Sequence, residues 1–234
     1  MPSTPLKDLF GVKGYVAVVT GGTSGLGHMI CKGLVQNGAI VYVVALPSEP
    51  IDECVTELNT LAKAASTEED DSIGLAIGYA CDVSSKANIA QLAAFVTARE
   101  HRLDLLVSNA GIRRDSPKAC DVLSAPLAEL QASIYATSKA ATDHLVRLLA
   151  AKFSRFYVRV NSINPGFVPS KMNPVGAEGN MFSNLFDKMP AKRAGQEDDI
   201  FGAVIYLASR GGSYIDGINL CIDGGRVLLA NGQA

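Results

Sequence analysis

The chain has 234 residues, a formal net charge of −2 and a hydrophobic fraction of 48%. This length suits one well-packed domain, and the near-neutral charge, with Lys and Arg scattered, argues against a nucleic-acid partner. No apolar run approaches the roughly 18 residues that a membrane span needs, and no apolar segment of a secretory signal opens the sequence. The 5 Cys have no paired spacing and the 3 His lie far apart, which predicts a cytoplasmic protein with reduced thiols and no metal site.

Short apolar runs alternate with longer amphipathic stretches along the whole chain. The apolar runs predict strands at residues 14–20, 39–46, 73–82, 103–110, 157–164 and 217–223. The amphipathic stretches predict helices at residues 25–37, 49–65, 85–101, 135–153 and 197–209, with Ser48 and Ser85 as N-caps. Nearly all-apolar strands that alternate with helices are typical of a parallel sheet covered on both faces. We therefore predict an α/β fold with a doubly wound parallel sheet, in a single domain spanning residues 1–234.

The stretch TGGTSGLG at residues 20–27 links the first predicted strand to the first predicted helix. Gly21 allows a tight turn with positive φ, Gly25 lets the backbone approach a pyrophosphate, and Gly27 lets the helix and strand pack closely. The helix N-terminus supplies free N–H groups and a partial positive charge, which suit a diphosphate. The turn therefore predicts a Rossmann-type dinucleotide site, built here from Gly21, Ser24, Gly25, Leu26 and Gly27.

Further motifs follow this turn in a fixed order. They are CDV (81–83), SNAG (108–111), YATSK (135–139), NPGFVPS (164–170) and DGG (223–225). With these motifs the chain resembles the short-chain dehydrogenase/reductase family almost from end to end, and its 3-oxoacyl-reductase-like members in particular. The resemblance implies a nicotinamide dinucleotide cofactor and a small-molecule carbonyl or alcohol substrate. It also implies a homo-oligomer, because the last strand of this family often packs at a subunit interface.

The resemblance also implies cofactor contacts outside the glycine turn. The residues implied are Asp82 and Val83 at the adenine, Asn109, Ala110 and Gly111 on the ribose side, and Gly166, Val168 and Ser170 towards the nicotinamide.

The end of the second predicted strand bears on the choice between NAD and NADP. An acidic residue there would bind the ribose hydroxyls of NAD, whereas a basic residue there or in the turn would hold the 2′-phosphate of NADP. The chain instead has Ala45 and Leu46 at this point and Ser24 in the turn. Because no acid repels a phosphate, we favour NADP(H) and leave NAD open.

Tyr135 and Lys139 are spaced i, i+4, so they share one face of a helix. A free Tyr has a pKa near 10, too high for efficient proton transfer at neutral pH. A nearby ammonium group favours the phenolate and lowers that pKa. The resemblance implies that Tyr135 is the proton donor or acceptor in hydride transfer, and that Lys139 lowers its pKa and holds the nicotinamide ribose. It implies that both residues also belong to the cofactor site.

The chain departs from the family pattern between Asn109 and Tyr135, which only about 25 residues separate. In the family, a longer stretch here holds a helix, a central strand and the Ser that hydrogen-bonds the reacting oxygen. Nothing in this interval resembles a helix followed by a strand. We therefore hypothesise an internal deletion between Ile134 and Tyr135, which leaves the fold without one central strand and its crossover helix.

Ser124 is the alternative for the missing active-site Ser. It belongs to the run CDVLSAP, which begins at Cys120 and loosely mimics a strand that ends in Ser. A parallel crossover needs at least about 10–12 residues including its helix, and the interval from Gly111 to Cys120 is too short to supply them. We favour a turn or cap role for Ser124, before a short helix at about residues 124–133.

The substrate side corresponds to residues 170–195, the lid region of the family. Its apolar side chains either cover an apolar substrate or pack on the core, and both readings stay open; they are Met172, Met181, Phe182, Leu185 and Phe186. The sequence thus predicts an NADP(H)-dependent oxidoreductase. Two alternatives are a dinucleotide-binding protein without turnover and an inactive truncated product.

Overall fold

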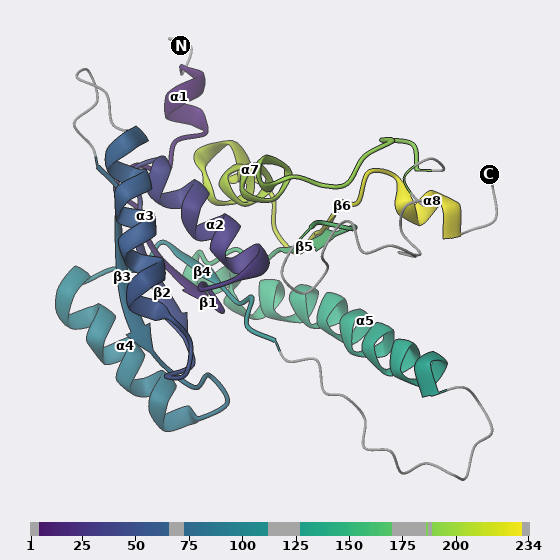
Figure 1. Cartoon of the computed structure of the whole chain (residues 1–234), viewed down its shortest axis with the longest axis horizontal. Helices are drawn as coiled ribbons and strands as arrows, with labels where there is room; N and C mark the ends of the chain where they lie inside the picture. Colours follow the sequence, from purple (N-terminus) through teal and green to yellow (C-terminus); the bar gives the residue numbers. More distant parts are fainter. Residues whose placement is uncertain (1–4, 66–72, 112–126, 170–185, 187–188, 231–234) are drawn as a thin grey trace. The chain divides into compact units, whose positions relative to one another are not determined.

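The computed structural model describes residues 5–65, 73–111, 127–169, 186 and 189–230 (Figure 1). The chain divides into two compact units, which are described separately. The first comprises Met1–Ala110, Pro165–Ser213 and Cys221–Ala234, and the second comprises Gly111–Asn164 and Tyr214–Leu220. Within the described ranges, no helix has both the length and the apolar character to cross a membrane.

A parallel sheet of four strands forms the centre of the first unit. The strands are β1 (Val16–Thr20), β2 (Ile40–Ala45), β3 (Leu75–Ala80) and β4 (Leu105–Val107), in the order β3-β2-β1-β4. Every residue of β1 is buried, as the apolar run at this position predicts for a strand covered on both faces. The predicted α/β fold with a Rossmann-type parallel sheet is confirmed.

Helices follow the strands in the alternation that the sequence predicts. They are α2 (Gly25–Gln36), α3 (Ile51–Ala65), α4 (Lys86–Glu100) and α7 (Glu197–Ala208), with the short segments α1 (Leu6–Leu9), η2 (Arg210–Gly212) and α8 (Arg226–Ala230). Ser85 is the N-cap of α4, because its side chain accepts a hydrogen bond from Asn88 N. Ser48 is not a cap, since α3 begins at Ile51 directly after Pro50.

The two faces of the sheet bury different residues of the same strands, as the period of two requires. On one face, Val16, Val18 and Tyr42 pack with Leu92 and Val96 of α4. The opposite face carries the alternate valines of β1 and β2, and α2 packs there against both strands and against α3 and α7 (Figure 1). Helices therefore cover both faces, which makes the sheet doubly wound.

The sheet has two open edges among the described residues. At one edge, Asn59 of α3 binds β3, accepting from Ala76 N (2.8 Å) and donating to Ala76 O (3.1 Å). At the other edge, β4 pairs only with β1 in the part of the chain that the structure describes. Leu106 of β4 is 60% exposed, although this strand lies next to the fully buried β1. The unpaired edge of β4 is what the loss of one central strand predicts.

The second unit consists of a long helix and a strand segment. Its elements are α5 (Leu127–Phe153), η1 (Ser154–Phe156) and the greater part of β5 (Ser162–Pro165). Strand β5 pairs with β6 (Asn219–Ile222) in a separate two-stranded sheet. The sequence predicted two helices, at about 124–133 and at 135–153, whereas α5 is continuous. The physical reason is that residues 127–134 contain neither Gly nor Pro, so nothing interrupts the helix.

Candidate active site

The glycine turn has the geometry that a dinucleotide site requires. Gly21 (φ 66°) and Gly25 (φ 55°) lie in the left-handed region that favours glycine. Helix α2 begins at Gly25, and its first backbone bond runs from His28 N to Ser24 O at 3.2 Å. The N–H groups of the first turn, including those of Leu26 and Gly27, therefore lie outside the helical ladder and can bind an anion.

Gly27 is required by a close approach of three chain segments. A Cβ atom at this position would collide with the carbonyl oxygen of Gly21 and would lie 2.5 Å from Asn109 Nδ2. The turn, the start of α2 and the end of β4 are thus packed too tightly for any side chain here. This tight packing fits a pyrophosphate lying on the backbone.

Thr20 and Asn109 lock the carboxyl ends of β1 and β4 together. The Thr20 hydroxyl accepts hydrogen bonds from the backbone N of Asn109 and of Ala110, both at 3.0 Å, and donates to Val107 O at 3.3 Å. Asn109 Nδ2 donates in return to Thr20 O (3.0 Å) and Gly21 O (3.2 Å). The sequence analysis missed Thr20. The signal available was a hydroxyl at the end of an otherwise wholly apolar strand.

Asp82 and Val83, the predicted adenine contacts, follow β3. The Ser84 hydroxyl and backbone N–H, the latter at 2.9 Å, donate hydrogen bonds that hold the pKa of Asp82 below its usual range. Val83 packs against the core cluster beside α4. Because β1 to β4 are parallel, the residues that follow them meet at one edge of the sheet, where open α/β sheets bind ligands. The structure therefore brings Gly21, Asp82 and Asn109 to the same edge.

The end of β2 carries no charged residue. Ala45 is buried and Leu46 is 42% exposed. The first charged residue beyond them is Glu49, whose backbone N donates to Leu46 O at 3.0 Å.

Tyr135 and Lys139 both belong to α5, so the predicted helix for this pair is confirmed. The Lys139 side chain is exposed, and the Tyr135 side chain lies outside the described atoms. One turn beyond Lys139, Asp143 accepts two hydrogen bonds from Asn164 Nδ2, at 3.1 and 3.3 Å. This contact ties the face of α5 that carries the pair to strand β5, and sequence reasoning did not identify it. Gly111 belongs to the same compact unit as this pair.

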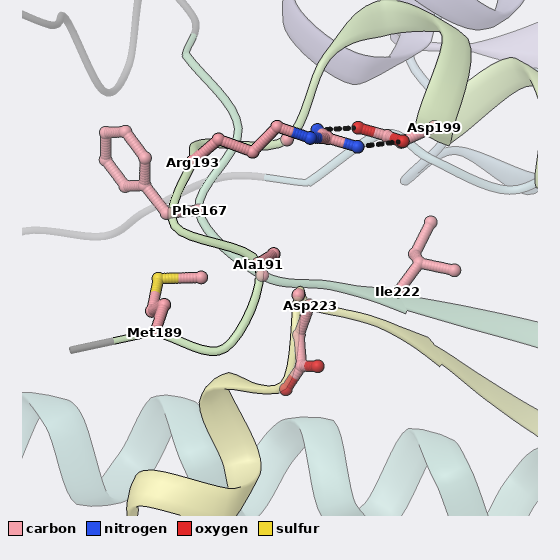
Figure 2. Close-up of a pocket in the computed structure, with 10 residues that line it drawn as sticks. Phe167, Met189, Ala191, Arg193, Asp199, Ile222 and Asp223 are labelled. Atoms are coloured by element: carbon pink, nitrogen blue, oxygen red, sulfur yellow. Dashed lines mark hydrogen bonds and ion pairs between the residues drawn. The ribbon is translucent and has the colours of Figure 1, made fainter. Parts of the chain in front are cut away.

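The segment after β5 holds Gly166 and Val168, and it lines a cavity of about 240 Å³ in the first unit (Figure 2). The backbone bond from Gly166 N to Ile222 O (3.2 Å) joins this segment to β6, and the bond from Gly195 N to Phe167 O (2.9 Å) joins it to the chain before α7. The predicted contact Ser170 and most of the predicted lid, residues 170–195, lie outside the described residues. Cofactor contacts at Gly166 and Val168 stay a prediction.

Comparisons with known proteins agree with this architecture. The family model for short chain dehydrogenases matches residues 15–125, and the model described as Enoyl-(Acyl carrier protein) reductase matches residues 119–226. Together they account for nearly the whole chain. The chain belongs to the short-chain dehydrogenase/reductase family.

Three relatives illustrate the range of this similarity. A 2-dehydro-3-deoxy-D-gluconate 5-dehydrogenase of Formosa agariphila is 26% identical over 261 positions, covering 93% of this chain and 94% of the relative. A ribulose-forming D-arabinitol 2-dehydrogenase of Scheffersomyces stipitis is 26% identical over 265 positions, covering 92% and 95%. Among solved structures, the NADPH-dependent 3-quinuclidinone reductase of Rhodotorula rubra superimposes with a TM-score of 0.75 at 25% identity, covering 97% of each chain.

The length of these alignments bears on the missing segment. Both curated relatives align over more positions, 261 and 265, than the 234 residues of the whole chain. The relatives therefore contain residues that have no counterpart here. This agrees with the short interval between Asn109 and Tyr135 and with the open edge of β4.

Proposed function

We propose that this chain is an NADP(H)-dependent oxidoreductase that transfers a hydride between the cofactor and a carbonyl or alcohol substrate. The observation that carries the proposal is the locked glycine turn, in which Gly21, Gly27, Thr20 and Asn109 form a tight backbone cradle at the carboxyl edge of the sheet. A Cβ would fill this cradle, so the residues present fit a dinucleotide. The bound nicotinamide would supply or accept the hydride.

The chain's own residues would then have distinct tasks. The N–H groups at the start of α2 would bind the pyrophosphate. Tyr135 would give a proton to the substrate oxygen or take one from it, and the Lys139 ammonium would favour the phenolate form of that Tyr. NADP(H) is favoured over NAD(H) because no acid stands at Ala45 or Leu46, where it would repel a 2′-phosphate. The NADPH-dependent relative supports the same choice.

A dinucleotide-binding protein without turnover is the second candidate. It is supported by the open edge of β4 and by the longer alignments of the relatives, since the strand that carries the family's active-site Ser has no counterpart among the described residues. Loss of such a hydrogen-bond donor costs on the order of 10²–10³ in rate. An inactive truncated product is the third candidate. A cytoplasmic location and a homo-oligomeric state are part of the first proposal.

One experiment separates these candidates. NADPH and NADH binding would be measured by fluorescence, NADPH oxidation with a panel of ketones by absorbance, and folding by a thermal melt. We expect NADPH to bind more tightly than NADH, and the Tyr135→Phe variant to bind NADPH unchanged while losing at least about 100-fold in turnover. Binding without oxidation would establish the second candidate, and absence of both binding and a cooperative melt would establish the third. Turnover that survives Tyr135→Phe would refute the assignment of Tyr135.

A further inference from the structure

The cavity beyond β5 and β6 is a feature of the first unit to which the proposed function has not yet given a role. Gly166 and Phe167 follow β5, and Asp223 and Gly224 follow β6, so the cavity opens at the carboxyl ends of these strands. Ligands of open α/β sheets bind at such ends. The predicted nicotinamide contacts Gly166 and Val168 belong to the same short segment.

The cavity is held in shape by its backbone. Ala191 N donates to Gly224 O at 3.1 Å, which joins the chain before α7 to the end of β6. Gly224 (φ 63°) and Gly225 (φ 86°) turn the chain there in the left-handed region. A Cβ on Gly166 would lie 2.7 Å from Asp223 Cα. The main chain around the cavity is therefore closely packed, and a ligand would meet a pre-formed surface.

The single cation among the described lining residues is already paired. Arg193 forms a two-pronged ion pair with Asp199, at 2.6 Å from Nη1 to Oδ2 and 2.9 Å from Nη2 to Oδ1, and also donates to Ala194 O (Figure 2). This pair and the bond to Ala194 O use three of the five guanidinium N–H groups, and the Asp199 carboxylate offsets the positive charge of Arg193. Arg193 and Asp199 together bring no net charge to the cavity.

Asp223 gives the cavity its remaining charge. Its side chain points away from the Arg193–Asp199 pair (Figure 2) and accepts hydrogen bonds from Gly225 N (2.9 Å) and Val227 N (2.7 Å). Burial acts to raise the pKa of Asp223, but these hydrogen bonds outweigh it and the pKa is lowered. The carboxylate is therefore ionised at neutral pH. The apolar part of the lining comes from Phe167, Met189 and Ile222.

We propose that this cavity receives the apolar body of the ketone or alcohol substrate, and that it selects neutral or cationic compounds over carboxylates. The inference rests on the proposed function and adds the class of substrate. A carboxylate would lose its hydration beside Asp223 and would find no free cation among the described lining residues.

Three ketones of the same ring size test the charge preference. They are 4-methylcyclohexanone, 4-(dimethylamino)cyclohexanone and 4-oxocyclohexane-1-carboxylate, titrated against the full chain by ligand-detected NMR with and without NADPH. We expect the carboxylate to bind at least about tenfold more weakly than the other two ketones, because its charge is repelled by the carboxylate of Asp223. Equal binding of the carboxylate and the neutral ketone would overturn the inference.

Two variants test the location. Ala191→Leu narrows the cavity and should weaken binding of the neutral ketone at least about fivefold. The same change at the exposed Ala90 of α4 should leave the affinity for this ketone unchanged. Asp223→Asn should reduce the difference between the carboxylate and the neutral ketone, a readout that a merely structural role would not move. The site would be refuted if folded Ala191→Leu bound the neutral ketone as tightly as the wild type does. It would also be refuted if folded Asp223→Asn kept the full difference in affinity between the carboxylate and the neutral ketone. A thermal melt and the NADPH affinity report the fold of each variant.

The outcomes separate this inference from the proposed function. Failure of hydride transfer would leave the cofactor-free ketone titrations interpretable, with the charge preference intact. Failure of the inference would show instead as NADPH binding and turnover that persist without any charge preference.

Discussion

At the scale of single residues, the site depends on positions that admit no side chain. The carbonyl oxygen of Gly21 and the amide of Asn109 occupy the space that a Cβ of Gly27 would need. Thr20 contributes a hydroxyl that serves two backbone donors at once. The cradle is therefore fixed by packing and hydrogen bonds before any ligand arrives.

The Gly27→Ala variant tests this packing. The added methyl group must displace the turn or the end of β4, so we expect a loss of roughly 1–3 kcal/mol in the free energy of unfolding and loss of NADPH binding. Gly202→Ala in α7 is the matched control, because a Cβ there has nothing within 4 Å. That change should stabilise the protein by up to about 1 kcal/mol. Urea unfolding and a fluorescence titration measure both effects, and equal behaviour of the two variants would contradict the packing argument.

Sequence reasoning succeeds at such positions when the chemistry is local. Gly21 was predicted because a tight turn between a strand and a helix needs positive φ, which Gly21 has; Gly25, predicted for a close backbone approach to a pyrophosphate, has positive φ as well. Thr20 was missed because its partners, Asn109 N and Ala110 N, lie far away in the sequence. The Asp143–Asn164 contact was missed for the same reason. Non-local hydrogen bonds leave no periodic trace in a sequence.

At the scale of elements, the N-terminus of α7 shows how side chains fix a helix start. Asp199 accepts from Gln196 N at 2.8 Å in a capping box and also pairs with Arg193. The hydrogen bond from Arg193, followed by that from the Gln196 backbone, lowers the pKa of Asp199 to about 2. An unfolded Asp has a pKa of about 3.9, so the ionised form is stabilised by folding.

The pH dependence of stability follows from the sign of this shift. Because the folded pKa is the lower one, the contribution of Asp199 is fully present above pH ~4 and is lost as the pH falls towards ~2. The stability difference between the wild type and Asp199→Asn should therefore shrink over this interval in urea titrations. Asp198→Asn, which removes a neighbouring exposed acid from the same helical turn, is the matched control. If the stability difference between the wild type and Asp199→Asn stayed constant from pH 4 to 2, the lowered pKa of Asp199 would be contradicted.

The edge of β3 supplies a second test at this scale. Asn59 satisfies both backbone groups of Ala76, whose neighbours in β3 bond to β2 instead. Asn59→Leu leaves these groups without their partner and should cost roughly 1–3 kcal/mol. Amide hydrogen exchange should accelerate at Ala76 more than at Ala17 in the central strand β1. Thr60→Val on the next, exposed position of α3 should leave the Ala76 amide unaffected, and acceleration there too would point to a general loosening of α3.

Element boundaries were predicted less well than element types, for reasons visible at particular residues. The apolar run 73–82 is longer than β3, because the ladder with β2 ends at Ala80 opposite Ala45. Ser48 had the chemistry of an N-cap, but Pro50 fixes a backbone angle suited to the start of a helix and α3 begins after it. Residues 127–134 join α5 because the hypothesised deletion point between Ile134 and Tyr135 interrupts the family pattern but introduces no residue that breaks a helix.

At the scale of the whole molecule, the chain keeps the family's motifs on either side of a shortened interval. The strands predicted from 14–20 to 103–110 form one parallel sheet, while the last two form a separate pair. In a complete sheet of this kind a central strand is buried on both faces. Here Leu106 of β4 is 60% exposed, whereas Val19 of the adjacent β1 is fully buried. Because side chains point to the faces of a sheet, the contrast shows that the face of β4 carrying Leu106 lacks the cover that helices give to β1 among the described residues.

Placing a charge on each of these two strands tests whether the face of β4 is open in solution. If the face of β4 that carries Leu106 is open, as the loss of the crossover helix predicts, Leu106→Lys puts an ammonium group into water and should change the free energy of unfolding by no more than about 0.5 kcal/mol. Lysines also protect open sheet edges against pairing with other chains, so sedimentation velocity should show less self-association. Val19→Lys buries the same charge inside the sheet and should abolish the cooperative melt. Equal damage from both variants would mean that this face of β4 is covered in solution, and the hypothesis that the crossover helix is missing would then be wrong.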